Sequence, residues 1–154
     1  MSVTGVVWDP AYLDHVTDAG HPDHPRRLEL LYRQLKDPAC NRRFATIAPP
    51  VATDEEILRV HSPTYLAQVK ATASMDMSAL SADTLTCDRS FQVAAMAAGG
   101  TIEAVRQVIA GSLSQALVLA RPPGHHAERT RAMGYCIFNN AAIGSTNVSV
   151  IGRK

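Results

Sequence analysis

Two adjacent histidines on a loop rich in proline and glycine are the residues best suited to chemistry in this sequence. The loop reads Arg-Pro-Pro-Gly-His-His-Ala-Glu over residues 121–128, and its histidines are His125 and His126. Histidine is the side chain whose ordinary pKa lies near neutral pH, so the pair is suited to general acid and base catalysis. In an extended loop the two rings are expected to point in different directions and to serve two atoms of one substrate. The alternative is that both imidazoles only form hydrogen bonds within the loop.

Two other chemistries at this loop have weaker support. Adjacent imidazoles rarely converge on one metal ion without further ligands, and the sequence contains no His-x-x-x-His spacing. Cys136 follows the histidines closely, and a histidine can activate a cysteine nucleophile. However, Cys136 lies between Tyr135 and Ile137 in an apolar run, so we predict an unreactive thiol in the core.

The composition predicts one soluble globular unit. A chain of 154 residues with 46% hydrophobic and 19% charged residues can form a single core. Its 15 Lys and Arg are spread along a chain of net charge +1, which predicts no nucleic-acid partner. Three cysteines leave one unpaired under any disulfide scheme, so a reducing cytoplasm is the expected location. No apolar stretch approaches the roughly 18 residues of a membrane span, so no membrane partner is expected.

Hydrophobic periodicity predicts helices separated by short strands. A β-branched first strand is expected at residues 3–8, and a helix at 27–36 with a stripe formed by Leu28, Leu31, Tyr32 and Leu35. Thr53 and Glu56 have the spacing of a capping box, so a short helix is expected through about residue 60. Another helix opens at Ser62-Pro63, and the small polar residues 72–82 are predicted to form an exposed loop.

The longest helix and the strand after it lead to the histidine loop. The helix is predicted over residues 90–110 and is ended by Gly111. Gly99 and Gly100 in its middle each cost about 1 kcal/mol relative to alanine, so the helix is expected to pack closely against another backbone. A strand follows at residues 116–120, and the histidine loop leaves from its carboxyl end. In open α/β sheets, ligands bind at that end of the strands.

Several separated motifs together resemble a known family. They are Gly20-His21-Pro22-Asp23-His24-Pro25-Arg26-Arg27, Val60-His61-Ser62-Pro63-Thr64-Tyr65, Asp83-Thr84, the histidine loop, and Met133-Gly134-Tyr135-Cys136-Ile137-Phe138-Asn139-Asn140. In this order they resemble the opening portion of the histone deacetylase and acetylpolyamine amidohydrolase superfamily, nearer its class II and bacterial branches than class I. The resemblance runs from about Val3 to Gly144. It implies an α/β fold, the first part of an arginase/deacetylase-type parallel sheet flanked by helices. Residues 1–144 are then the N-terminal portion of a deacetylase domain, and residues 145–154 are a divergent tail.

The resemblance implies catalytic roles for the two histidines. His125 matches the histidine that assists electrostatically and as an acid, and His126 matches the base that acts on metal-bound water. Gly134 and Tyr135 match residues that line the narrow acyl-lysine tunnel, where an aromatic face suits an alkyl chain. The alternative for Tyr135 is a core aromatic.

The resemblance also implies roles for one aspartate and one arginine. Asp83 matches a rim aspartate that accepts hydrogen bonds from substrate amides, and Arg27 matches an arginine of an inner channel below the active site. The alternatives are that Asp83 flanks and caps a helix and that Arg27 is a surface charge.

The family's metal ligands have no counterpart in this sequence. Zinc is held there by two aspartates and one histidine, all downstream of the Asn-Asn segment, and it polarises the acetamide carbonyl and activates water. This chain contains no Asp, Glu or His after Glu128. We therefore expect no metal ligands and no zinc bound by the chain as given, and we interpret it as truncated, frameshifted or a fragment.

The implied substrates are acetylated lysine or an acetylated polyamine, hydrolysed only when the domain is completed. Two alternatives stay open: a metal-free module that binds an acylated amine, and a fragment without function. Because further strands are expected in the family, a sheet edge and an apolar face should stay uncovered. Marginal folding is therefore predicted, and an oligomer is possible.

Overall fold

A three-stranded parallel sheet forms the centre of the structure, a computed structural model that describes residues 3–151. Its order is β2-β1-β5, with β1 at Thr4–Val7, β2 at Ala45–Ile47 and β5 at Gln115–Val118. Val7 is fully buried and is paired with Ile47 on one side and Val118 on the other. The two strands expected from the sequence are β1 and β5, and the predicted fold class, a parallel sheet flanked by helices, is confirmed.

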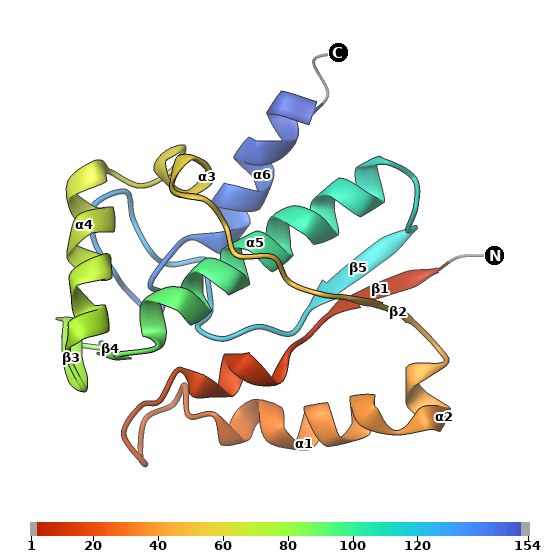
Figure 1. The fold of residues 1–154 in the computed structure, drawn as a ribbon, viewed down its shortest axis with the longest axis horizontal. Helices are drawn as coiled ribbons and strands as arrows, with labels where there is room; N and C mark the ends of the chain where they lie inside the picture. The colour runs from red at the N-terminus through yellow and green to blue at the C-terminus, as the bar shows by residue number, and fades with distance from the viewer. Residues whose placement is uncertain (1–2, 152–154) are drawn as a thin grey trace.

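Helices cover both faces of this sheet (Figure 1). Helix α1 (Arg26–Lys36) lies on one side, and α5 (Ser90–Ile109) with α6 (Asn140–Ile151) lies on the other. Leu28 and Tyr32 of α1 are buried as expected, but Leu31 is 46% exposed, so the apolar stripe is narrower than predicted. These two buried α1 residues belong to one hydrophobic cluster with Val7 of β1 and Val93 of α5.

The shorter elements connect these layers. They are η1 (Pro10–Asp14), α2 (Pro38–Asn41), α3 (Asp54–Leu58), α4 (Pro63–Ala71), η2 (Thr72–Ser74), β3 (Met77–Ser81) and β4 (Thr84–Cys87). Helix α3 begins at the predicted capping box: the Glu56 amide donates to Thr53 Oγ1 at 3.2 Å, and the Thr53 amide donates to Glu56 Oε2 at 2.8 Å. These bonds satisfy two amides that have no partner inside the helix.

The segment predicted to be an exposed loop at residues 72–82 is instead a helical turn and a strand. Strand β3 pairs antiparallel with β4, and the hydroxyls of Ser78 and Thr86 lie 2.9 Å apart across the pair. The prediction was wrong because this hairpin is held by backbone pairing between polar strands, which leaves little apolar alternation in the sequence. Helix α6 (Asn140–Ile151) likewise extends into the segment assigned to a divergent tail, of which residues 152–154 lie outside the described residues. The division at residue 144 stays a prediction.

Close packing of α5 is confirmed at Gly99. A Cβ atom there would lie 2.1 Å from the Pro50 carbonyl oxygen and 2.7 Å from the Ala52 amide nitrogen. The Ala52 amide donates to the Ala95 carbonyl at 3.0 Å, so an extended segment runs directly along the helix. Gly111 follows the helix with φ +73°, as expected of a residue that ends one.

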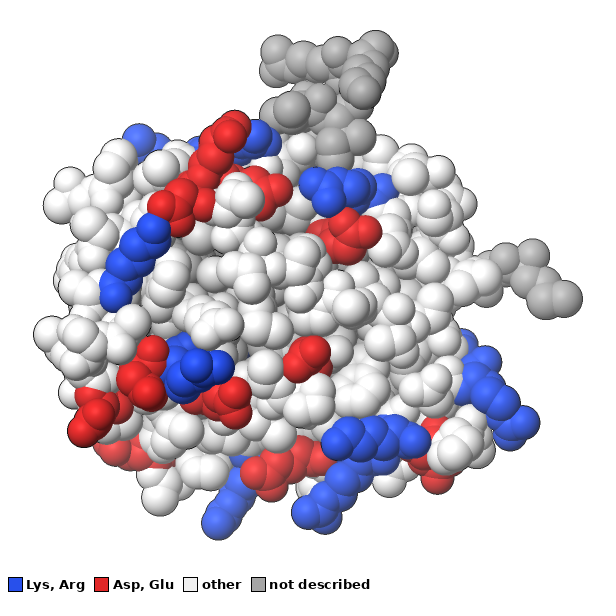
Figure 2. Space-filling model, in the orientation of Figure 1, with Lys and Arg blue, Asp and Glu red and all other residues white. Residues whose placement is uncertain are grey.

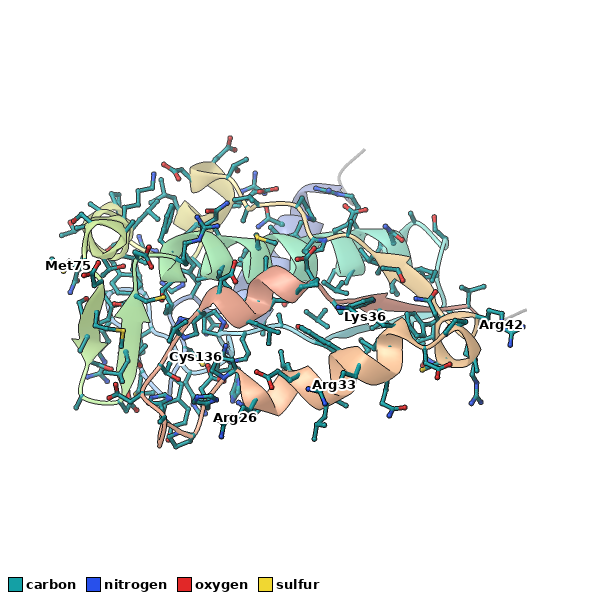
Figure 3. The ribbon with its side chains drawn as sticks, turned by 60° about the horizontal axis from the view of Figure 1, so that its bottom comes forward. Arg26, Arg33, Lys36, Arg42, Met75 and Cys136 are labelled. Carbon is teal, nitrogen blue, oxygen red and sulfur yellow. The ribbon has the colours of Figure 1, made fainter. Side chains whose placement is uncertain are left out.

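Charged side chains of both signs are interspersed on the face of the molecule shown in Figure 2. In Figure 3 several cations project outward along α1 and α2, namely Arg26, Arg33, Lys36 and Arg42. Within residues 3–151, no helix combines the length and apolar character that crossing a membrane requires.

Candidate active site

One cavity of about 380 Å³ brings together all six residues predicted to form the site. Its lining contains Arg27, Asp83, His125, His126, Gly134 and Tyr135, together with Pro22 and Pro123. These residues come from the start of α1, the turn between β3 and β4, the loop after β5 and the following turn. Segments more than fifty residues apart in the sequence therefore meet at one place.

The sheet positions the histidine loop. Strand β5 ends at Val118, and the next amide, of Leu119, donates to the Val7 carbonyl at 2.9 Å. The Tyr32 hydroxyl then donates to the Leu119 carbonyl at 2.6 Å. The loop thus leaves the sheet beside the carboxyl end of β1, which is the expected place for a ligand site in an α/β fold.

The two imidazoles lie side by side. The ring centroids of His125 and His126 are 4.2 Å apart and the rings are tilted by 44°, so the expectation that they point in different directions was wrong. Both His125 and His126 are exposed to solvent. Their backbone amides both donate to the sulfur of Cys136, each at 3.4 Å, and this contact pulls the two residues to the same side.

Cys136 anchors the loop from inside the molecule. Its side chain is fully buried, as predicted, and Figure 3 shows it within the fold. Its Sγ–H also donates a hydrogen bond to the Gly134 carbonyl at 3.3 Å. A thiol enclosed in this way has no access to a substrate, so the cysteine nucleophile has no support.

Gly134 and Tyr135 form a tight turn against the histidines. Both have positive φ angles, 59° and 64°, and the backbone groups of Met133 and Cys136 pair across them at 3.3 and 3.0 Å. This is the pattern of a type I′ turn, in which a tyrosine is strained. A Cβ atom on Gly134 would lie 2.7 Å from the His126 ring.

The turn directs the tyrosine to the cavity and not to the core. Tyr135 is half-buried and meets the edge of the His21 ring, with centroids 4.9 Å apart and planes at 75°. The alternative of a core aromatic is therefore wrong. His21 itself was not predicted to belong to the site; its place beside Tyr135 depends on folding of the polar loop before α1.

Asp83 joins the hairpin to this turn. Its Oδ2 accepts a hydrogen bond from the Gly134 amide at 3.0 Å, and its Oδ1 accepts from the hydroxyls of Ser81 at 2.8 Å and Thr84 at 3.0 Å. These hydrogen bonds hold the pKa of the Asp83 carboxyl below its usual value, and the bond from Ser81 has the largest effect. Asp83 lies in a turn between two strands, so the alternative of a helix-flanking cap is wrong.

Arg27 is tethered at the cavity and is not a free surface charge. Its side chain is 58% exposed, and its Nη1 donates to Asp23 Oδ1 at 2.7 Å. Asp23 is fully buried and also contacts Arg121. Sequence reasoning missed both of these residues, because a buried ion pair between residues 98 positions apart leaves no local pattern.

The side chains around the imidazoles do not fit a zinc site. Within residues 3–151, no group of three or more His, Cys, Asp or Glu is arranged to hold a metal ion. A catalytic zinc site needs three protein ligands with an open position, and the described residues do not supply that set.

The fold and the cavity define an α/β domain of the deacetylase class, with an imidazole pair at the carboxyl edge of a parallel sheet. A family model described as the histone deacetylase domain matches residues 21–152. The chain belongs to the histone deacetylase family.

Similar proteins are longer than this chain. Histone deacetylase HDA1 of Candida albicans is 37% identical over 147 residues, covering 83% of this chain and 18% of that protein. Polyamine deacetylase HDAC10 of Danio rerio is 36% identical over 125 residues, covering 77% of this chain and 18% of that protein. The crystal structure of the HDA15 HD domain superposes with a TM-score of 0.91 at 30% identity, covering 99% of this chain and 45% of that one. The chain thus spans less than half the length of each.

Proposed function

We propose that this chain forms the N-terminal, proton-handling part of a zinc-dependent deacetylase that hydrolyses acetyl-lysine or acetylpolyamine amides. The observation that carries the proposal is the single cavity in which the imidazole pair lies beside the Gly134-Tyr135 turn. Residues 1–144 contribute this part of the domain. The remaining residues are proposed as a divergent tail.

The residues present divide the work of amide hydrolysis. His126 takes a proton from the attacking water, and His125 donates a proton to the leaving amine. The ring of Tyr135 packs against the alkyl chain that carries the acetamide, and the Asp83 carboxylate accepts hydrogen bonds from substrate amides at the rim. Binding and proton transfer are therefore assigned to this chain. Activation of the acetamide carbonyl is not assigned to this chain.

We propose that the chain alone does not turn over substrate. Both imidazoles are open to solvent, whereas charge stabilisation in hydrolytic sites depends on excluding bulk water. The described donors also fit no zinc site. Ligands and walls from a further polypeptide segment would have to complete the site.

A second candidate is a metal-free module that binds an acylated amine without cleaving it. It is favoured by one observation, that the Tyr135 ring lines the cavity beside the imidazole pair and is held there by an edge contact with the His21 ring. A third candidate, a fragment without function, requires that the cavity binds neither substrate class.

Titration with an acetyl-lysine peptide and with N-acetylputrescine, each with and without zinc, separates these candidates. Chemical-shift changes in the Tyr135 and His126 resonances report binding, and an enzymatic acetate assay reports turnover. The deacetylase-part proposal predicts weak binding and no acetate release. Tight, saturable binding without zinc selects the second candidate, and no binding selects the third.

Two variants locate the binding. Tyr135→Ala should abolish the shifts, while Met133→Ala, in the same turn but outside the cavity lining, should retain them. Acetate release with stoichiometric zinc would contradict the proposal that the chain alone is inactive. Comparison of the two ligands identifies the substrate class.

A further inference from the structure

A buried carboxylate, that of Asp23, binds Arg27 of the cavity lining and Arg121 at the start of the histidine loop. Asp23 Oδ1 accepts hydrogen bonds from Arg27 Nη1 at 2.7 Å and from Arg121 Nε at 3.3 Å. Arg121 Nη2 donates to the Asp23 carbonyl, and its Nη1 donates to the carbonyls of Tyr12 at 3.2 Å and His15 at 2.9 Å. All three nitrogens of this guanidinium therefore have partners, although the side chain is only 2% exposed.

The same network continues to the start of α5. The other oxygen of the carboxylate, Asp23 Oδ2, has no hydrogen-bond partner among the described residues and lies 3.7 Å from His15 Nε2. His15 Nδ1 lies 2.7 Å from Ser90 Oγ, and Ser90 Oγ also accepts from the Cys87 amide at 2.8 Å. Asp23, His15, Cys87 and Ser90 are all buried. One polar chain thus connects a helix terminus, the loop before α1 and the histidine loop.

Stability alone does not account for this arrangement. Removing two charges from water costs several kcal/mol per ion, and an apolar group of similar volume often serves as well or better. Here one carboxylate oxygen even lacks a partner among the described residues, which adds to the cost. What the network does provide is a fixed geometry, because a planar guanidinium with several acceptors has one orientation.

We propose that Asp23 is a positioning residue for the histidine pair, acting through Arg121. Arg121 begins the loop that carries both imidazoles, and the amides of His125 and His126 are bound at its other end by Cys136. The loop is therefore fixed at both ends, to a buried carboxylate and to a buried sulfur. Arg27, held by the same oxygen of Asp23, also lines the cavity.

The charges around Asp23 are consistent with this role. Burial raises the pKa of its carboxyl, while Arg121 and then Arg27 oppose that shift and favour the ionised form. Burial also lowers the pKa of His15 to about 3, so this imidazole is neutral and does not compete with the arginines for the carboxylate. The inference rests on the proposed function, because a fixed pair of imidazoles matters only where they handle protons.

Hydrogen exchange of the His125 and His126 backbone amides tests the proposal on the full chain. Asp23→Asn keeps the size of the side chain and removes its charge, and it should accelerate exchange at these amides by about tenfold or more while leaving the middle of α5 unchanged. The imidazole resonances of both histidines should shift as well. Glu128→Gln is the matched control, since it removes a carboxylate of the same loop that, within the described residues, takes part only in an exposed ion pair with Arg131.

Loss of overall stability with unchanged loop exchange and unchanged imidazole resonances would show a merely structural role and overturn the proposal. If Asp23→Asn does not fold, Arg121→Lys is expected to give the same local effect, because lysine keeps the charge but cannot reach all the acceptors. If neither variant folds, the positioning role is not separable from folding and the proposal fails. None of these readouts requires substrate binding, so failure of the proposed function is recognised separately in the titrations.

Discussion

The backbone at Gly134 determines where His126 can lie. Because φ is +59° there and an added Cβ would meet the imidazole at 2.7 Å, Gly134→Ala should strain the turn and displace the ring. We expect the free energy of unfolding to fall by about 1–3 kcal/mol, measured by urea denaturation, with a shift of the His126 resonances. Gly20→Ala is the control, since a methyl group at that position would meet no atom within 4 Å. Equal effects of the two changes would contradict this account of the turn.

Burial of His15 predicts loss of stability in mild acid. Burial lowers its pKa from 6.5 to about 3, so between these values the unfolded chain binds a proton that the folded protein does not. The contribution of His15 to the free energy of unfolding is fully present above pH 6.5. It falls as the pH decreases toward 3, by up to about 1.4 kcal/mol per pH unit. His61, whose pKa burial also lowers, acts in the same direction.

The contribution of His15 is isolated by substitution. In His15→Asn the dependence of the unfolding free energy on pH between about 7 and 5 should be shallower, because the residue that must stay neutral is gone. His24→Asn changes a less buried histidine of the same loop and should keep the slope of the unmodified protein. An unchanged slope in His15→Asn would show that this imidazole is not the acid-sensitive group.

Residue types and motif order predicted which residues line the site, but not the buried contacts that hold them in place. All six predicted residues line one cavity. Their motifs lie at the start of α1, in the turn between β3 and β4, and in the segment after β5. The Asp23–Arg121 pair was not predictable, since neither residue has a local pattern that signals burial. The relative orientation of the imidazoles was missed for a similar reason: it depends on a distant sulfur.

At the scale of elements, Gly99 is the point where α5 touches the segment after β2. Replacing a helical glycine with alanine usually adds about 1 kcal/mol of stability, but here the new Cβ would lie 2.1 Å from the Pro50 carbonyl oxygen. Gly99→Ala should therefore destabilise the protein, by about 1–3 kcal/mol as in other overpacked sites, in urea or thermal unfolding. A gain in stability would show that the backbones can separate at no cost.

Helices were predicted more reliably than the hairpin. The capping residue Thr53 and the 3.6-residue period of α5 are local signals, and the structure contains both features. Strand β2 and the β3–β4 hairpin depend on pairing with distant or polar partners, so short windows of sequence do not reveal them. Helix α6 was missed because its polar and β-branched residues have weak helix propensity, and packing against α5 outweighs it.

At the scale of the whole molecule, one edge of the sheet stays uncovered within the described residues. Strand β5 ends the sheet order, and beside it lies an apolar cavity of about 360 Å³ between β5 and α5. Leu117 on this strand is 52% exposed. An edge strand of this kind presents unpaired backbone groups and an apolar surface, which favours association.

We therefore predict that the isolated chain is marginally stable and associates as its concentration rises. Leu117→Lys should lower the apparent mass measured by sedimentation velocity at high concentration, because a charge on an edge strand opposes pairing. Leu30→Lys places the same change on an exposed position of α1 and should have no such effect. A cooperative thermal transition that is independent of concentration, from a monomer, would contradict the prediction.

The placement of β1 at the centre of the sheet has a consequence for biosynthesis. Strand β1 is synthesised well before β5, with which it pairs, and the side chains of Thr4 and Gln115 meet across a separation of 111 residues. Such long-range pairing is slow to form, because the intervening chain must be ordered first. While the ribosome is still extending the polypeptide, the N-terminal segment has no partner on its β5 side, and chaperones that shield nascent apolar segments have their longest opportunity to act on this region.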